Sequence, residues 1–281
     1  MNLNELYKQA YYKNKSGMIF CGDCVQIMKQ MDDACIDLTV TSPPYDNLRT
    51  YNGYCFDFEN VAKELYRVTK DGGVVVWVVG DATIKGSETG TSFKQALYFK
   101  EIGFNLHDTM IYEKNSLPMN HNRYEQEFEY MFIFSKGKPK TFNPIRIPCK
   151  YPEKETARQN SKYSYTDEKM RKARSNKQRK PVGQNKIKGN IWRYTTGHNH
   201  STKDSIAFKH PAIFPEQLAN DHIISWSNEG DIVLDPFSGS GTTHKMALLN
   251  NRRFIGFEIS QEYVDIETQR LKDCGLWRYD Y

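Results

Sequence analysis

One stretch of the sequence decides the fold: Ile232-Val233-Leu234-Asp235-Pro236-Phe237-Ser238-Gly239-Ser240-Gly241-Thr242-Thr243. Its first three residues suit a buried strand, its two glycines suit a tight turn, and the chain that follows is typical of a helix. A strand, a glycine turn and a helix in this order can bind a nucleoside, because the turn allows close approach to the backbone and the helix begins with unpaired N–H groups. We therefore interpret the turn as a cofactor loop. Its candidate cofactor-binding residues are Asp235, Phe237, Gly239, Gly241 and Thr242.

An acidic residue follows the next predicted strand, where a nucleotide-binding sheet needs one. Residues 254–257 are apolar, and Glu258 comes directly after them, 17 residues beyond Gly241. A carboxylate there would meet ribose hydroxyls, because the carboxyl ends of parallel strands share one edge of the sheet. The loop has neither the lysine of a P-loop nor the GxGxxG pattern of a dinucleotide site. A glycine turn that binds no ligand is the alternative interpretation.

Strands and helices alternate along the rest of the chain. Apolar runs predict strands at 18–20, 36–40, 74–79, 108–112, 127–134, 232–234 and 254–257. Helical spacing predicts helices at 24–31, 58–69, 92–102, 215–225, 241–250 and 261–272, the second of them closed by Asp71-Gly72-Gly73. This alternation predicts a doubly wound α/β fold with a mostly parallel, seven-stranded, Rossmann-like sheet.

Charge is divided unevenly along the chain. The net charge of the 281 residues is +5, yet residues 136–188 carry 17 Lys and Arg against 4 Asp and Glu, which leaves a balance of −8 elsewhere. The same segment is rich in proline, asparagine, glutamine and serine and shows no long apolar periodicity. We interpret it as an inserted region that binds a polyanion such as nucleic acid, with a solvated basic loop as the alternative.

The composition is typical of a globular cytoplasmic protein. Hydrophobic residues make up 38% of the chain, and the longest apolar run, Val74–Val79, is far too short to span a bilayer. The N-terminal residues lack the apolar stretch of a secretory signal. The six cysteines are scattered, and Cys21 and Cys24 have no second pair beside them, so we predict reduced thiols and no metal site. A cytoplasmic location without membrane association is therefore expected.

A second motif follows the predicted strand 36–40: Thr41-Ser42-Pro43-Pro44-Tyr45. Two consecutive prolines end the strand, and the carboxyl end of a strand is the ligand side of an open α/β sheet. The Ser42 hydroxyl and the Pro43 carbonyl can accept hydrogen bonds, while the Tyr45 ring can stack on a base rotated out of a duplex. By itself the motif indicates only a rigid loop.

Together the two loops resemble the permuted, or β-class, DNA amino-methyltransferases, in which an (S/D)PP(Y/F/W) loop precedes the cofactor loop. The early element Gly22-Asp23-Cys24, the segment His210–Glu216 and the strand Phe254–Glu258 also match in order, so the resemblance covers about residues 18–270. It implies a Rossmann-like methyltransferase fold and S-adenosylmethionine as the cofactor. It also implies direct methyl transfer, without a metal ion, to an exocyclic amino group of duplex DNA.

The resemblance implies a role for each matching residue. The catalytic residues would be Ser42, Pro43, Pro44 and Tyr45. The cofactor-binding residues outside the cofactor loop would be Asp23 at the adenine amino group, Glu258 at the ribose, and Cys24, Thr41, His210 and Phe214.

The basic insertion resembles the target-recognition region of this family. The predicted domains are then a catalytic half at 1–135, the target-recognition insertion at 136–190 and a cofactor-binding half at 191–281. The candidate DNA-binding residues are Arg49, Lys169, Arg171, Lys172, Arg174, Lys177, Arg179 and Lys180.

Ser42 bears on which base is modified. A serine in this loop resembles the cytosine-N4 members of the family, whereas an aspartate is typical of adenine-N6 members. We therefore predict cytosine-N4 methylation, with adenine-N6 methylation as the alternative. A cytosine-C5 enzyme would need a nucleophilic Pro-Cys, and the only such pair, Pro148-Cys149, lies in the insertion.

Other functions and partners stay open at this point. A methyltransferase for RNA or protein amines is one alternative, and a non-catalytic DNA-binding protein on the same scaffold is another. Double-stranded DNA is the expected partner. A paired restriction endonuclease and a homodimer are compatible with the sequence.

Overall fold

The computed structural model describes residues 3–44, 56–115, 123–150 and 183–274. The chain forms two compact units, one of residues 1–143 with 190–281 and the other of residues 144–189. In the smaller unit, β9 (Arg146–Pro148) pairs antiparallel with β10 (Asn185–Ile187). The predicted insertion starts eight residues earlier, at Lys136, but this residue belongs to the larger unit. Its Nζ donates to the carbonyls of Tyr66 and Thr69, both at 3.0 Å.

Among the described residues, nine strands form the sheet of the larger unit, in the order β1-β2-β13-β12-β3-β4-β8-β7-β11. Only β1 and β8 run antiparallel to their neighbours in this sheet. Seven of the strands match the apolar runs: β2 (Gly17–Cys21), β3 (Ile36–Thr41), β4 (Thr69–Val79), β7 (Asn105–Glu113), β8 (Phe128–Ser135), β12 (Ile232–Asp235) and β13 (Arg253–Glu258). The predicted count of seven is corrected to nine, because β1 (Tyr12–Asn14) and β11 (Ile191–Arg193) are three-residue edge strands too short to show a period. The doubly wound, mostly parallel α/β fold is confirmed.

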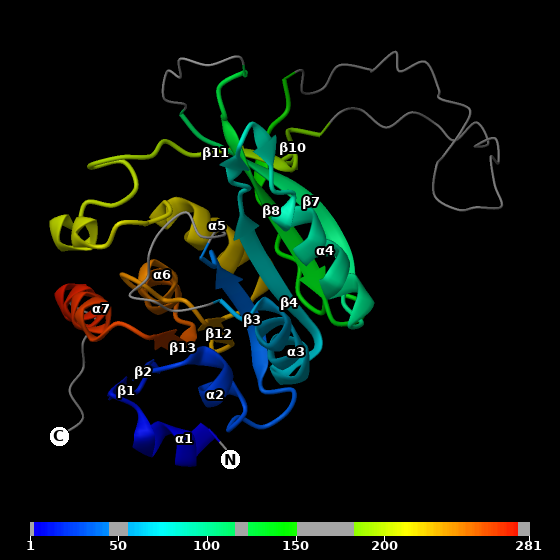
Figure 1. Ribbon diagram of the computed structural model, residues 1–281. Helices are drawn as coiled ribbons and strands as arrows, with labels where there is room; N and C mark the ends of the chain where they lie inside the picture. The colour runs from blue at the N-terminus through cyan, green and yellow to red at the C-terminus, as the bar shows by residue number, and fades with distance from the viewer. Residues whose placement is uncertain (1–2, 45–55, 116–122, 151–182, 275–281) are drawn as a thin grey trace. The chain divides into compact units, whose positions relative to one another are not determined.

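Helices cover both faces of this sheet. One layer is formed by α2 (Cys24–Met28), α3 (Phe58–Val68) and α4 (Thr91–Glu101), and the other by α5 (Glu216–Trp226), α6 (Thr242–Leu249) and α7 (Gln261–Asp273) (Figure 1). The chain moves one way along the sheet from β3 to β4 and the opposite way from β12 to β13. Right-handed crossovers in opposite directions put the helices on opposite faces. All six predicted helices are present.

Several short elements carry no signal that the sequence analysis detected. They are α1 (Leu3–Gln9), the hairpin of β5 (Thr83–Ile84) and β6 (Ser87–Glu88), and the 3-10 helix η1 (Ser205–Lys209). They flank the sheet and its loops and leave the doubly wound order unchanged.

Strand β4 begins before its apolar run. Ile36 pairs with Thr69 and Leu38 pairs with Val74, so residues 70–73 bulge out of the ladder between β3 and β4. The turn predicted at 71–73 to close a helix is therefore a bulge inside a strand. Gly72 has a φ of 79°, which glycine adopts without steric cost. The run Val74–Val79 is buried along its whole length, as expected for a strand covered on both faces.

The core packs against both faces of the sheet, and aromatic side chains fill much of it. Trp77 of β4 is fully buried, lies edge-on to Phe99 of α4 with ring centroids 5.1 Å apart, and donates from its indole nitrogen to Gln95 at 2.8 Å. Phe99 in turn stacks on Phe134 of β8. These contacts hold the α4 layer to the strands on which the site is built.

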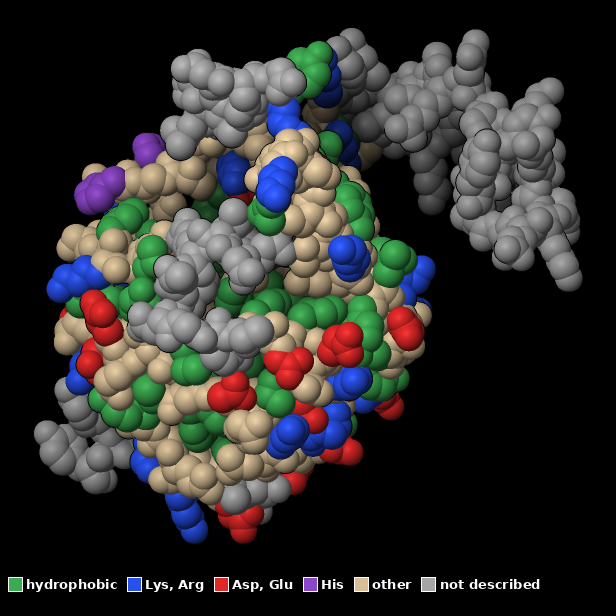
Figure 2. Space-filling view, viewed as in Figure 1, with side chains coloured by type: hydrophobic (Ala, Val, Ile, Leu, Met, Phe, Trp, Pro, Cys, Tyr) green, Lys and Arg blue, Asp and Glu red, His purple; other side chains and the backbone are tan. Residues whose placement is uncertain are grey.

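Acidic and basic side chains are interspersed over α3 in the view of Figure 2. Within the described part of the chain, no helix has both the length and the apolar character needed to cross a membrane.

The sheet reverses its direction of winding between the neighbouring strands β3 and β12. In open α/β sheets, the crevice outside the carboxyl ends of the strands at this switch point is where ligands bind. The loop after β3 starts with Ser42, and the loop after β12 starts with Pro236. Both predicted functional loops therefore leave the sheet at its switch point.

Candidate active site

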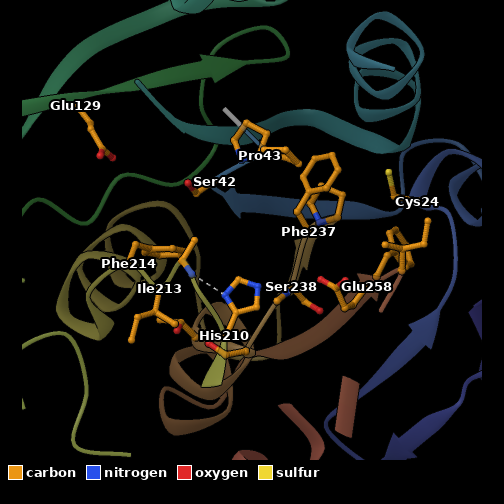
Figure 3. Close-up of a pocket in the computed structure, with 18 of the residues that line it drawn as sticks. Cys24, Ser42, Pro43, Glu129, His210, Ile213, Phe214, Phe237, Ser238 and Glu258 are labelled. Atoms are coloured by element: carbon orange, nitrogen blue, oxygen red, sulfur yellow. Dashed lines mark hydrogen bonds between the residues drawn. The ribbon is translucent and has the colours of Figure 1, made fainter. Parts of the chain in front are cut away.

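A cavity of about 670 Å³ opens at this switch point, and all the residues that line it belong to the larger unit. Most of the described residues predicted to form the site lie on its wall: Asp23, Cys24, Ser42, Pro43, Pro44, His210, Phe214, Phe237, Gly239, Thr242 and Glu258. Thr41, Asp235 and Gly241 do not line the cavity themselves, but they belong to the loops that do or to the strand ends from which these loops start. Figure 3 shows Ser42 and Pro43 in the middle of the cavity, with Cys24 and Glu258 to one side and Glu129 to the other.

A buried hydrogen bond joins the two functional loops. The Thr41 hydroxyl, at the end of β3, donates to Asp235 Oδ1, at the end of β12, at 2.6 Å. The same oxygen accepts the backbone N–H of Phe237 at 3.1 Å. Asp235 is 1% exposed, and burial raises the pKa of its carboxyl. Thr41 and Asp235 therefore fix the spacing between the Ser-Pro-Pro loop and the cofactor loop.

The cofactor loop keeps a conformation that requires glycine. Gly239 and Gly241 have φ values of 51° and 78°. A Cβ on Gly239 would stand 2.9 Å from His210 Nε2, and one on Gly241 would stand 2.5 Å from Glu267 Cγ. Ser238 also anchors the loop to β13, because its N–H donates to the carbonyl of Phe257 at 2.9 Å. Side chains at the two glycine positions would both strain and displace the loop.

The Glu258 carboxylate joins the loop that follows β12 to the loop that follows β13. Its Oε2 accepts the N–H of Gly239 at 3.0 Å, and its Oε1 accepts the N–H of Ser260 at 2.9 Å. Burial raises the pKa of Glu258 to about 7, against the lowering effect of these two hydrogen bonds. A carboxylate oxygen has a second lone pair, so Glu258 can still accept from a ligand hydroxyl in the cavity.

Asp23 and Cys24 border the same end of the cavity. Asp23 caps α2, with Oδ1 accepting the N–H of Gln26 at 2.9 Å. Its neighbour Cys24 is buried. The backbone N–H of Gly22, just before them, donates to the carbonyl of Glu258 at 2.8 Å. The structure therefore brings Asp23 and Glu258 to one end of the cavity, although the sequence separates them by more than 200 residues.

The segment around His210 forms the wall of the cavity next to Gly239 of the cofactor loop. His210 Nδ1 accepts the N–H of Ala212 at 3.1 Å (Figure 3). The His210 ring also lies edge-on to Tyr263 of α7, with ring centroids 4.3 Å apart. Ile213 and Phe214 line the wall beyond it. Ile213 and Phe214 therefore give this side of the cavity an apolar lining.

A polar wall that the sequence analysis missed lies at the far end of the cavity. It is formed by Tyr112 and Lys114 of β7 and its continuation, and by Glu129 of β8. Tyr112 and Glu129 are directly paired across the strands, and Lys114 forms an ion pair with Glu129. Polar residues that alternate along a strand are also expected on a strand that faces solvent. The sequence pattern of β7 and β8 therefore does not indicate that these side chains face a cavity.

A buried ionic network beneath the cofactor loop was also missed. Glu267 of α7 accepts from the Ser238 hydroxyl at 2.7 Å and pairs with His244 of α6. Arg270 is 1% exposed, and its guanidinium donates to the carbonyl of Ser240, to Glu216 at 2.8 Å and to Asp204 at 3.0 Å. Glu267 and Arg270 belong to α7, whose polar sequence predicts a solvent-exposed helix. Only the fold shows that these two side chains are buried.

Several predicted site residues lie outside the described residues. These are Tyr45 and Arg49 near the catalytic loop and, in the insertion, Lys169, Arg171, Lys172, Arg174, Lys177, Arg179 and Lys180. The predicted stacking of Tyr45 and the predicted DNA contacts therefore stay predictions. Among the described residues, no three His, Cys, Asp or Glu side chains gather as a metal ion would need.

Comparison with known proteins places this cavity in context. Residues 36–269 match the model of a family described as DNA methylase. The orphan methyltransferase M.BamHII of Bacillus amyloliquefaciens is 62% identical over 248 residues, which cover 87% of this chain and 92% of the relative. The type II methyltransferase M.BglII of Bacillus subtilis is 28% identical over 272 residues, or 93% of this chain and 71% of the relative.

Solved structures share the fold. The PvuII DNA methyltransferase (cytosine-N4-specific) superposes with a TM-score of 0.66 at 19% identity, covering 95% of this chain and 93% of that one. TTHA0409 from Thermus thermophilus, complexed with S-adenosyl-L-methionine, gives a TM-score of 0.61 at 23% identity, covering 91% of this chain and 93% of that one. At these identities the likeness establishes the Rossmann-like architecture alone.

Proposed function

We propose that this chain, which belongs to the DNA methylase family, transfers a methyl group from S-adenosylmethionine to the exocyclic N4 of cytosine in duplex DNA. One observation supports the proposal above all. The hydrogen bond from Thr41 to Asp235 joins the Ser-Pro-Pro loop to the cofactor loop at the switch point of the sheet, and both loops line one cavity. A methyl donor and an acceptor amine held in one cavity need little further positioning, which is the main requirement of direct transfer.

The cavity fits this cofactor. Its volume of about 670 Å³ lies within the range of small-molecule sites. Glu258 would accept from the ribose hydroxyls and Asp23 from the adenine amino group, while His210 and Phe214 would border the methionine part. When bound, S-adenosylmethionine supplies an electrophilic methyl group on its sulfonium sulfur. No metal ion is needed for this transfer.

The Ser-Pro-Pro loop would bind the target amine. The Ser42 hydroxyl oxygen and the Pro43 carbonyl oxygen would accept its two hydrogens, which turns the lone pair of the nitrogen out of the plane of the base. Pro43 and Pro44 line the cavity and restrict the backbone, so the two acceptors keep their geometry before the base arrives. A base in a duplex reaches such a cavity only when it is rotated out of the stack.

Ser42 supports cytosine as the target. An aspartate would draw more electron density onto the weakly nucleophilic adenine amine, whereas a neutral hydroxyl is a sufficient acceptor for cytosine. We expect DNA from cells that express the protein to contain N4-methylcytosine, measured by mass spectrometry of its nucleosides, with DNA from cells expressing Ser42→Ala as the control. Finding N6-methyladenine without N4-methylcytosine would refute the choice of base and leave the family assignment intact.

Duplex DNA is the proposed partner, and the basic insertion at 136–190 is its proposed recognition region. Apart from Lys136, whose ammonium is bound inside the larger unit, the basic residues between 136 and 188 would neutralise phosphates and release counterions. A homodimer and a paired restriction endonuclease are further predictions from the sequence. Sedimentation of the protein with and without DNA would test the first of these.

Cofactor binding should depend on pH through Glu258. Because burial raises the pKa of this group to about 7, about half of the free protein carries a protonated carboxyl at neutral pH. The ionised form accepts hydrogen bonds from ribose more strongly. We therefore expect the affinity for S-adenosylmethionine, measured by calorimetry, to rise by up to about tenfold per pH unit below pH 7 and to level off above it. Glu258→Gln should bind more weakly and without this slope, so equal slopes in both proteins would contradict the assigned role.

A further inference from the structure

We propose that the polar wall of Tyr112, Lys114 and Glu129 reads the ring edge of the extruded base, with Tyr112 and Lys114 donating to N3 and O2 of cytosine. This inference rests on the proposed function and extends it from the amine to the rest of the base. The wall lines the same cavity as Ser42 and Pro43. Figure 3 shows Glu129 across the Ser-Pro-Pro loop from Glu258, away from the proposed ribose site.

Tyr112 provides the first donor of the polar wall. The residue is 2% exposed and lines the cavity, and within the described residues its hydroxyl has no hydrogen-bond partner. A buried hydroxyl without a partner destabilises the fold, and a ligand in the cavity that pairs with the Tyr112 hydroxyl would remove this cost. Burial, together with the nearby Glu129 carboxylate, raises the pKa of Tyr112 well above its usual range. The hydroxyl therefore keeps its proton and can act as a donor.

Lys114 provides a second donor on the same wall. Its ammonium is held by Glu129, whose Cα pairs in register with that of Tyr112 across β7 and β8. An ammonium has three N–H donors, and one of them points to Glu129, so others can reach a ligand. Glu129 also balances the positive charge, which keeps the wall from drawing electrons out of the base. One neutral donor and one charge-balanced ammonium suit an uncharged heterocycle.

The donor pattern matches cytosine better than adenine. Beside its amine, cytosine presents two consecutive acceptors, N3 and then O2, whereas adenine presents N1 followed by a C–H group. A wall with two donors satisfies both acceptors of cytosine and would leave one donor unpaired against adenine. A site that leaves a buried polar group unpaired rejects the wrong ligand strongly. The two donors of the wall therefore favour cytosine independently of Ser42.

The test is a cycle of protein variants and a base analogue. Sequencing of DNA from expressing cells first maps the modified cytosine, and duplex oligonucleotides are then made with cytosine or 3-deazacytosine at that position. The analogue replaces N3 by C–H and pairs more weakly with guanine, so its easier extrusion would favour reaction. The wild type should nevertheless lose about 10- to 100-fold in kcat/KM on the analogue, because a donor is left unpaired.

The variants Tyr112→Phe and Lys114→Met should each lose a similar factor on cytosine. At least one of them should show almost no further loss on 3-deazacytosine, because its contact with N3 is already gone. If the losses multiply in both variants, neither side chain touches N3 and the inference is wrong. The affinity of both variants for S-adenosylmethionine should equal that of the wild type. A weaker affinity would assign the wall to the cofactor and also overturn the inference.

Tyr194→Phe is the matched control. Tyr194 lies next to Tyr112, with ring centroids 5.9 Å apart, but its hydroxyl donates to Asp221 at 2.7 Å. Removing that hydroxyl should lower Tm and leave kcat/KM unchanged. Removing the Tyr112 hydroxyl should do the reverse, with Tm equal or higher and kcat/KM lower. A fall in Tm for Tyr112→Phe would show a structural role instead.

The two levels of the proposal fail differently. If the wild type makes N6-methyladenine, the choice of cytosine is wrong, and the inference about its ring edge is wrong with it. If the wild type makes N4-methylcytosine but the losses multiply, only the inference about Tyr112 and Lys114 is wrong.

Discussion

Replacing Asp235 with alanine is expected to abolish most methyl transfer and to lower the stability of the protein. The Thr41 hydroxyl and the Phe237 N–H would both lose their acceptor inside the protein. Two unsatisfied buried donors should lower the free energy of unfolding by about 2–5 kcal/mol. The two functional loops would also lose their common anchor, and a displacement of about 1 Å between reacting groups can slow a reaction by about 100-fold. Denaturant unfolding and a methyl-transfer assay measure the two effects.

Asp37→Ala is the matched control for this prediction. Asp37 links the same two strands at their opposite end, where its carboxylate accepts the N–H of Ile232 at 3.0 Å and pairs with Lys70. Its loss should reduce stability while the affinity for S-adenosylmethionine stays unchanged. Asp235→Asn keeps an oxygen acceptor and should recover most of the stability. If Asp235→Ala retained cofactor affinity, the loops would be positioned by other contacts.

The positions of the Ser-Pro-Pro loop and the cofactor loop could be predicted because their sequence signals are local. Consecutive prolines at 43–44 must end a strand, and Gly239 and Gly241 mark a turn that other residues would strain. The apolar runs before them form strands buried on both faces, for which no register has to be known. The neighbourhood of β3 and β12 then follows from the doubly wound order.

The polar wall and the buried network could not be predicted, because their environment is set by distant parts of the chain. Glu129 acquires its role only through its register with Tyr112 on the neighbouring strand. Glu267 and Arg270 belong to a helix with many polar residues, and they become buried only because the cofactor loop, α6 and η1 pack against that helix. A one-residue change of register would put the same side chains on the other face of a strand.

Replacing Glu267 with alanine is expected to lower the free energy of unfolding by about 3–5 kcal/mol, because it leaves a buried partner without its counter-charge. Glu267 and His244 are both fully buried, and they form an ion pair. The Ser238 hydroxyl on the cofactor loop would also lose its acceptor. We therefore expect a weaker affinity for S-adenosylmethionine along with the loss of stability, measured by denaturant unfolding and by calorimetry.

The pH dependence of stability separates this pair from simple packing. Burial acts to lower the pKa of His244, but the Glu267 carboxylate outweighs it, and the pKa is raised overall. The charged pair therefore stabilises the wild type fully below the ordinary histidine pKa of about 6.5, and this contribution is lost as pH rises through the raised value. In Glu267→Ala burial dominates, so stability should instead fall as pH drops below about 6.5. Glu59→Ala breaks an exposed ion pair with Lys63 at 3.9 Å, so it should leave the free energy of unfolding and its pH slope nearly unchanged. An unchanged slope in Glu267→Ala would mean that His244 is neutral in the folded protein and that the pair is held by a neutral hydrogen bond.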